Sequence, residues 1–116
     1  MSEIKDLTIN MLEHNEAIWE LYLANRADQQ TFDFYKDMKP FVDAVKETSD
    51  QWLALVIPWV NTARPTYLGQ AQLEQVAENI QMIAVSAFNG KSFYKHFNDH
   101  YQSVEYTLKR VLEKAL

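Results

Sequence analysis

Apolar residues recur every three or four positions along almost the whole chain, and no stretch alternates steadily between apolar and polar side chains. Spacings of three and four place side chains on one face of an α-helix, whereas alternation is typical of a half-buried strand. The pattern predicts helices over about 3–26, 32–63, 70–87 and 93–115. The predicted inward-facing residues are Ile4, Leu7, Met11, His14, Ile18 and Leu21; Phe34, Met38, Phe41, Val45, Thr48, Trp52, Leu55 and Trp59; Leu73, Val76, Ala77, Ile80, Ile83, Ala84 and Ala87; and Phe93, Phe97, His100 or Tyr101, Val104, Leu108, Val111 and Ala115.

The boundaries between these helices are marked by proline and glycine. Pro65 disfavours a helical backbone at Arg64, so the second helix is predicted to end near residue 63. Gly69 permits a tight connection to the third helix. Gly90 is a suitable left-handed cap for the end of that helix, and Ser92 can cap the start of the fourth.

The second helix is the one with internal interruptions. Thr31 is the predicted N-cap. Pro40 and Pro58 each remove one helical hydrogen bond. Thr48–Asp50 lies in a sequence that matches a capping box, which permits a break. We therefore expect this helix to be kinked or broken at Pro40, Thr48–Asp50 or Pro58.

The overall pattern predicts an all-α chain. There are only two glycines and three prolines, too few for the many turns of an all-β domain. Short connections between consecutive helices make neighbours antiparallel. We therefore predict one domain, residues 1–116, folded as an up-and-down antiparallel four-helix bundle.

Charge and composition narrow the functional classes. The net charge is −5, which disfavours binding to a nucleic-acid backbone. The chain has no cysteine, so thiolate metal sites and disulfides are excluded. The N-terminus has no basic segment followed by an apolar run, and the most apolar stretch, WLALVIPWV, is too short to span a bilayer. These features predict a cytoplasmic protein that binds neither nucleic acid nor membrane.

Three segments resemble the YppE-like family of small uncharacterised proteins from Gram-positive bacteria. They are TFDFYKDMKPFV at 31–42, ARPTYL at 63–68 and SVEYTLKRV at 103–111, in matching order and spacing. The resemblance extends over nearly the whole chain. It implies a four-helix bundle without an assigned activity, and it does not single out the histidines.

The three histidines are the candidate metal ligands. His96 and His100 are four residues apart and can face one ion, and His14 is placed on the inner face of the first helix. Three histidines on a bundle resemble the metal centre of DinB-like proteins. The alternative, which we favour, is one core-facing histidine satisfied by a neighbour and two on the surface. The sequence lacks a Glu-x-x-His motif, which disfavours a di-iron carboxylate centre.

The other polar residues give little indication of a catalytic site. Glu13, Glu16 and Glu20 share a face of the first helix but flank its apolar stripe, where we expect them to be solvated. No glycine-rich phosphate loop and no Gly-x-Ser-x-Gly motif occurs. We favour a chain that is not an enzyme and predict no cofactor.

Arg64 and Tyr67 are the candidate binding residues. In an up-and-down bundle the end of the second helix lies beside the end of the fourth and the start of the third. Arg64 can there hold the last carbonyls of its helix or pair with Glu113. It can instead present its planar fork to a carboxylate or phosphate outside the chain. We favour the structural role for Arg64.

The function that fits these observations best is a protein-interaction or regulatory module whose partner is another protein. One alternative is a metal-dependent, DinB-like enzyme that uses His14, His96 and His100. Another is a carrier of a small apolar ligand, because aromatic residues such as Trp19, Trp52 and Trp59 can line a groove as well as fill a core. The sequence leaves the partner and the oligomeric state open.

Overall fold

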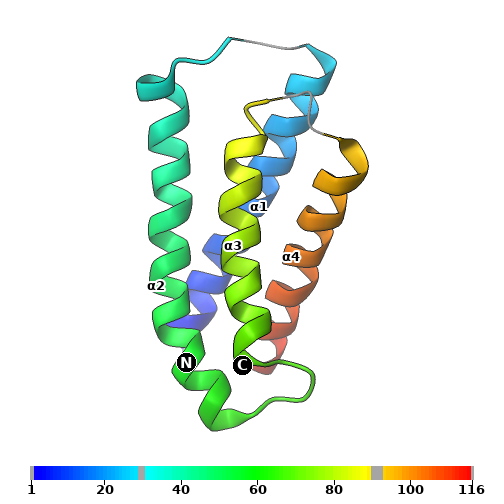
Figure 1. Ribbon diagram of the computed structural model, residues 1–116. Coiled ribbons are helices and arrows are strands. Elements are labelled where there is room, and N and C mark those ends of the chain that lie inside the picture. Colours follow the sequence, from blue (N-terminus) through cyan, green and yellow to red (C-terminus); the bar gives the residue numbers. More distant parts are fainter. Residues whose placement is uncertain (1, 29–30, 90–92, 116) are drawn as a thin grey trace.

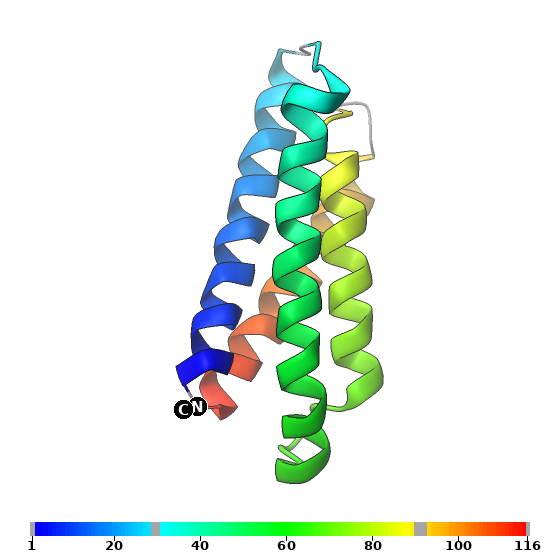
Figure 2. The same cartoon turned by 90° about the vertical axis from the view of Figure 1, so that its left-hand side faces the viewer.

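The computed structural model describes residues 2–28, 31–89 and 93–115. These residues form the helices α1 (Ser2–Ala27), α2 (Lys39–Ala63), α3 (Gln70–Ser86) and α4 (Tyr94–Lys114), with a π-helical turn η1 (Phe34–Met38) before α2. Consecutive helices run in opposite directions, and Figures 1 and 2 show them side by side in one bundle. Packing contacts place α2 against α1 and α3, and α4 against α3 and α1. The predicted up-and-down four-helix bundle is confirmed.

The inward face of α1 differs from the predicted one. The buried residues follow a spacing of four and three: Ile4, Thr8, Met11, Asn15, Ile18, Tyr22 and Asn25. Three of them are polar, so the apolar pattern could not identify the face. The predicted Leu7, His14 and Leu21 lie at its half-buried edge.

Each polar residue of this face bonds to another part of the bundle or to its own helix. The amide nitrogen of Asn15 donates to the carbonyl of Tyr101 on α4 at 3.1 Å. That of Asn25 donates to the carbonyls of Ala87 and Phe88, just beyond α3, at 3.1 and 3.0 Å. Buried polar groups are costly without partners, so these bonds fix how α1 sits against α3 and α4.

The start of the second helical segment corrects the predicted cap. Thr31 does not cap it. Asp33 does, because its carboxylate accepts the backbone N–H of Lys36 at 2.7 Å. The turn that follows is π-helical: the N–H of Met38 donates to the carbonyl of Asp33 five residues back, at 3.2 Å. Pro40 then stands in the first turn of α2, a position that proline tolerates.

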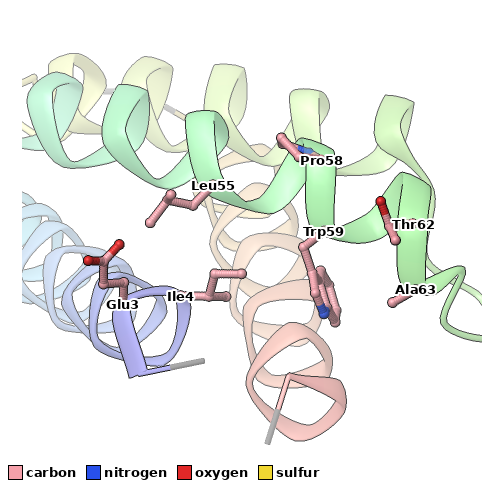
Figure 3. Close-up of a pocket in the computed structure, with 7 residues that line it drawn as sticks. All are labelled: Glu3, Ile4, Leu55, Pro58, Trp59, Thr62 and Ala63. Carbon is pink, nitrogen blue, oxygen red and sulfur yellow. The ribbon is translucent and has the colours of Figure 1, made fainter.

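Helix α2 itself is continuous. Of the three places where we expect a kink or a break, Thr48–Asp50 shows no break, because Lys39–Ala63 forms one helix that runs through both this segment and Pro58. Figure 1 shows the lower end of α2 leaning out of line with the rest of the helix, and Figure 3 places Pro58 near the start of that lean. Proline has this effect because it removes one bond and crowds the preceding turn.

On α3 and α4 the buried residues are close to the predicted ones, whereas on α2 the buried face is shifted relative to the prediction. All seven positions predicted around α3 are buried. On α2 the buried set is Val45, Ser49, Trp52, Val56 and Val60. Phe34 and Phe93, both predicted to face inward, are 55% and 79% exposed. On α4, Tyr101 rather than His100 is the buried member of the stripe.

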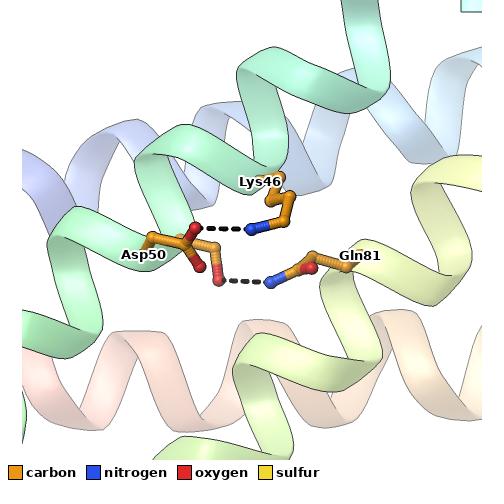
Figure 4. A network of polar contacts seen from close by, with 4 residues as sticks. Lys46, Asp50 and Gln81 are labelled. Atoms are coloured by element: carbon orange, nitrogen blue, oxygen red, sulfur yellow. Dashed lines mark hydrogen bonds and ion pairs between the residues drawn. The ribbon is translucent and has the colours of Figure 1, made fainter. Parts of the chain in front are cut away.

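The α2–α3 seam carries a polar contact beside its apolar core. Gln81 of α3 donates its side-chain N–H to the buried hydroxyl of Ser49 at 3.2 Å. Figure 4 shows this bond next to the ion pair between Lys46 and Asp50 on α2, which is 2.7 Å long. The exposed ion pair adds little stability, whereas the Gln81 bond satisfies the one buried hydroxyl of α2.

The connection between α2 and α3 uses its residues differently from the prediction. Helix α2 ends at Ala63, as predicted. Gly69, however, has extended backbone angles (φ −142°, ψ 165°) that any residue can adopt. The left-handed positions are Arg64 and Tyr67. The predicted caps Gly90 and Ser92 lie outside the described residues.

No helix in the described part of the chain is both long enough and apolar enough to cross a membrane.

Candidate functional site

The loop of residues 64–69 joins α2 to α3 at the end of the bundle where α1 begins and α4 ends (Figure 1). Arg64 ends α2 in the left-handed conformation (φ 47°, ψ 54°), and its backbone N–H donates to the carbonyl of Val60 at 3.0 Å. Tyr67 is also left-handed, with φ 65°. This conformation crowds the Cβ atom of a residue other than glycine and costs roughly 1–2 kcal/mol. The 64–69 loop therefore holds two unfavourable backbone conformations.

Arg110 of α4 holds this loop in place. Its guanidinium carbon lies 5.8 Å from the centre of the Tyr67 ring and 5.7 Å from that of Tyr106. One terminal nitrogen is 3.5 Å from the carbonyl of Thr66, and the other is 3.4 Å from the Tyr106 hydroxyl. Its Nε atom is buried and has no hydrogen-bond partner among the described residues. Cation–π contacts of this kind contribute about 0.5–1 kcal/mol each at exposed sites.

The side chain of Arg64 does not fill the structural role that we favoured from the sequence. It is exposed and, within the described residues, makes no hydrogen bond or ion pair, with Glu113 or with the last carbonyls of α2. The ring of Tyr67 is 82% exposed. What Arg64 contributes to the fold is its backbone, which closes α2. Both side chains are thus left facing outward on a loop that Arg110 anchors.

A groove lies next to this loop, between the start of α1 and the end of α2. It has a volume of about 350 Å³, and its lining residues are Glu3, Ile4, Leu55, Pro58, Trp59, Thr62 and Ala63. Figure 3 shows Glu3 and Ile4 on α1 and the other five residues on α2. The lining is mostly apolar, with the Glu3 carboxylate as its charged group. Ala63 joins the groove to Arg64 along the chain.

The three histidines do not come together. The Nε2 atom of His14 on α1 lies 3.1 Å from the Thr48 hydroxyl on α2. His96 and His100 line a separate hollow between α3 and α4, on the opposite side of the bundle. Among the described residues, no group of three histidine, aspartate or glutamate side chains is placed to hold a metal ion. Burial lowers the pKa of His14, partly offset by the neighbouring carboxylate of Glu13.

Glu16 is exposed, as the sequence predicts, but it also has a partner on another helix. It accepts a hydrogen bond from the hydroxyl of Tyr101 on α4. Burial and then the bond to Glu16 raise the pKa of this phenol, so Tyr101 stays a donor at physiological pH. The Tyr101 ring also stacks on Trp19, with ring centres 4.5 Å apart and planes 12° from parallel. These groups fasten α1 to α4 and form no open reactive site.

Sequence reasoning missed the residues that build the surroundings of Arg64 and Tyr67. Arg110 lies near the end of α4, where a basic residue is favourable whatever it contacts, so its position alone does not single it out. The spacing of Tyr106 and Arg110, four residues apart, was the available signal, because such pairs share a helix face. The placement of Glu3 and Trp59 along one groove has no local signal, since these residues are 56 positions apart.

Comparison with known proteins places the chain among uncharacterised bacterial relatives. Residues 8–115 match a bacterial domain of unknown function, DUF1798. The uncharacterised protein YppE of Bacillus subtilis is 26% identical over 109 residues, which cover 94% of this chain and 89% of YppE. The resemblance inferred from the three sequence segments is therefore confirmed.

Solved structures have the same fold. A Listeria innocua protein of unknown function is 61% identical, with a TM-score of 0.95 over 97% of this chain and 90% of that chain. The crystal structure of B. subtilis YppE is 25% identical, with a TM-score of 0.91 over 97% and 93% of the two chains. A Staphylococcus aureus DUF1798 domain, 20% identical, has a TM-score of 0.88 over 97% and 95% and supports the fold alone.

Proposed function

We propose that this chain, which belongs to the DUF1798 family of bacterial domains of unknown function, is a non-catalytic module that binds a segment of another protein. The binding surface would consist of the 64–69 loop, with Arg64 and Tyr67 as its main contacts, and the adjoining α1–α2 groove. This places the site at one end of the bundle rather than in a catalytic pocket.

The observation that carries the proposal is the conformation of Arg64 and Tyr67. Both have positive φ, and both side chains are exposed. Among the described residues Tyr67 contacts the edge of the bundle through Arg110, and its ring is mostly exposed, so the fold gains little burial in return for its backbone strain. Strained residues that a rigid scaffold holds outward are common at ligand-binding sites, because they present side chains without a further ordering cost on binding.

The chemistry of the surface indicates the kind of segment that fits it. Arg64 offers a free planar fork, which suits a carboxylate with two parallel hydrogen bonds. The groove offers an apolar floor and the aromatic ring of Trp59 for one apolar side chain. We therefore propose that the partner segment carries an acidic and an apolar residue a short distance apart.

The test is affinity capture from lysate of a Gram-positive host, followed by titration of the purified partner. Arg64→Asn and Tyr67→Asn are the variants of choice, because asparagine tolerates the left-handed conformation and keeps the loop geometry. Tyr35→Asn is the matched control, since Tyr35 is an exposed tyrosine at the other end of the bundle. Arg64→Lys separates the planar fork from the charge.

We expect each loop variant to weaken binding at least about tenfold, which is about 1.4 kcal/mol, with Tyr35→Asn unchanged. Circular dichroism must show that all variants remain folded. A partner that binds the loop variants as tightly as the unmodified chain would refute the proposal.

A second candidate function is that the chain carries a small apolar ligand in the same groove. Its volume of about 350 Å³ and its mostly apolar lining lie within the usual range of small-molecule sites. Native mass spectrometry of the purified chain tests this: a co-purifying molecule released by Trp59→Ala would support the carrier. Binding of that molecule unaffected by Trp59→Ala would place it elsewhere.

A further inference from the structure

A hollow of about 320 Å³ lies between α3 and α4, near the start of α4. Its polar lining comes from His96, His100 and Ser86, and its remaining walls from Met82, Ile83, Phe93 and Phe97. The two histidines are four residues apart on α4, so their rings leave the same face of the helix. The hollow is at the opposite end of the bundle from the 64–69 loop, and nothing in the proposed function uses it.

The orientation of His100 is fixed by a hydrogen bond. Its Nδ1 atom lies 2.8 Å from the backbone carbonyl oxygen of His96. A carbonyl oxygen only accepts hydrogen bonds, so Nδ1 carries the proton of the neutral ring. The lone pair of His100 is then on Nε2. A histidine that donates one ring N–H to a carbonyl and presents the other nitrogen has the arrangement usual for metal-ligating histidines.

We propose that His96 and His100 together bind one divalent transition-metal ion, with Nε2 of His100 as one ligand and a ring nitrogen of His96 as the other. Water would complete the coordination on the open side of the hollow. Imidazole nitrogen suits Zn²⁺, Ni²⁺ and Cu²⁺, whereas Mg²⁺ and Ca²⁺ prefer oxygen ligands. The thioether of Met82 and the hydroxyl of Ser86 lie on the facing helix, where they can contact the ion or its water.

This site differs from the three-histidine centre that the sequence suggested. His14 takes no part, because it lies in the α1–α2 seam with Thr48 as its partner. The only carboxylate between the two histidines on α4 is that of Asp99. It is 61% exposed and lies 3.9 Å from the amine of Lys95. A site with two protein ligands and several waters therefore holds an ion that is accessible to solvent. It differs from a closed structural centre, in which protein side chains supply all the ligands.

The experiment is isothermal titration of the tag-free chain, stripped with a chelator, with Zn²⁺, Ni²⁺ and Cu²⁺ in turn and with Mg²⁺ as a hard-ion control. The variants are His96→Gln and His100→Gln. His14→Gln is the matched control, because it makes the same change at a histidine in the other seam. Circular dichroism verifies that each variant remains folded before titration.

We expect the unmodified chain and His14→Gln to bind one transition-metal ion with equal affinity and to ignore Mg²⁺. Each of His96→Gln and His100→Gln should weaken binding at least tenfold. Absence of binding to the unmodified chain, or binding that survives both substitutions, would overturn the proposal.

Discussion

The hydrogen bond between Trp52 and Thr8 offers a sharp test of how the bundle is held together. The indole N–H of Trp52 on α2 donates to the Thr8 hydroxyl on α1 at 3.0 Å, and that hydroxyl donates to the Ile4 carbonyl at 2.7 Å. Both Trp52 and Thr8 are 0% exposed. Thr8→Val keeps the branched shape of the side chain and removes only the hydroxyl. The indole N–H then has no partner in the core.

The expected loss follows from the groups involved. A buried donor left without a partner costs about 1–3 kcal/mol. The Ile4 carbonyl keeps its helical bond from the backbone N–H of residue 8, so it adds no penalty. The added methyl group returns about 0.8 kcal/mol of apolar burial. We therefore expect Thr8→Val to lower the free energy of unfolding by up to about 2 kcal/mol, which for 116 residues lowers Tm by up to about 8 °C.

Urea unfolding followed by circular dichroism at the helical band measures this change. Thr8→Ser is the control, because it retains the hydroxyl and loses only a methyl group. The second background is Trp52→Phe, in which no indole N–H remains to be satisfied. There Thr8→Val should cost much less than in the unmodified chain. An equal cost in both backgrounds would refute the hydrogen bond as the source of the loss.

Three further predictions concern other parts of the bundle. Arg110→Ala should speed backbone hydrogen exchange of residues 64–69 and lower the free energy of unfolding by about 1–2 kcal/mol, because it removes the contacts with two tyrosine rings; unchanged exchange would contradict its anchoring role. Burial lowers the pKa of folded His14 below 6.5, so the unfolded chain binds the proton first. The free energy of unfolding should fall as the pH drops through 6.5 towards the folded pKa, and His14→Gln should reduce this slope in urea unfolding at several pH values. Gly69→Ala should be neutral or stabilise by up to about 1 kcal/mol in thermal unfolding, because Gly69 is extended and a Cβ atom there meets nothing within 4 Å; a marked loss would contradict the loop geometry.

Local features of the sequence were enough to predict the helices and several of their ends. The apolar spacing of α3 identified its whole buried face, because that face is purely apolar. Pro65 indicated the end of α2 one residue before Arg64, since the residue preceding proline avoids the helical conformation. The same reasoning failed for Thr48–Asp50. A capping sequence there competes with continued helix, and burial of Ser49 and Trp52 on both sides of Asp50 favours the helix.

The candidate surfaces depended on contacts between distant residues. Arg64 and Tyr67 could be selected as candidates from the sequence. Whether the loop residues have partners could not be predicted, because the partner is Arg110 of α4, more than 40 residues away. The histidines were likewise visible as candidates. Their separation into two seams followed only from the packing order of the helices.

The sequence by itself determined that this chain is helical and where most helices begin and end. It also determined which apolar faces of α3 and α4 are buried. It could do so because the spacing of apolar residues and the effect of proline on the backbone are local properties of the chain. Only the tertiary structure decided the inward face of α1. Thr8, Asn15 and Asn25 are buried there because Trp52 and the carbonyls of Tyr101, Ala87 and Phe88 provide their hydrogen-bond partners. A polar side chain enters a core when distant groups satisfy it, and those groups become its neighbours only when the chain has folded.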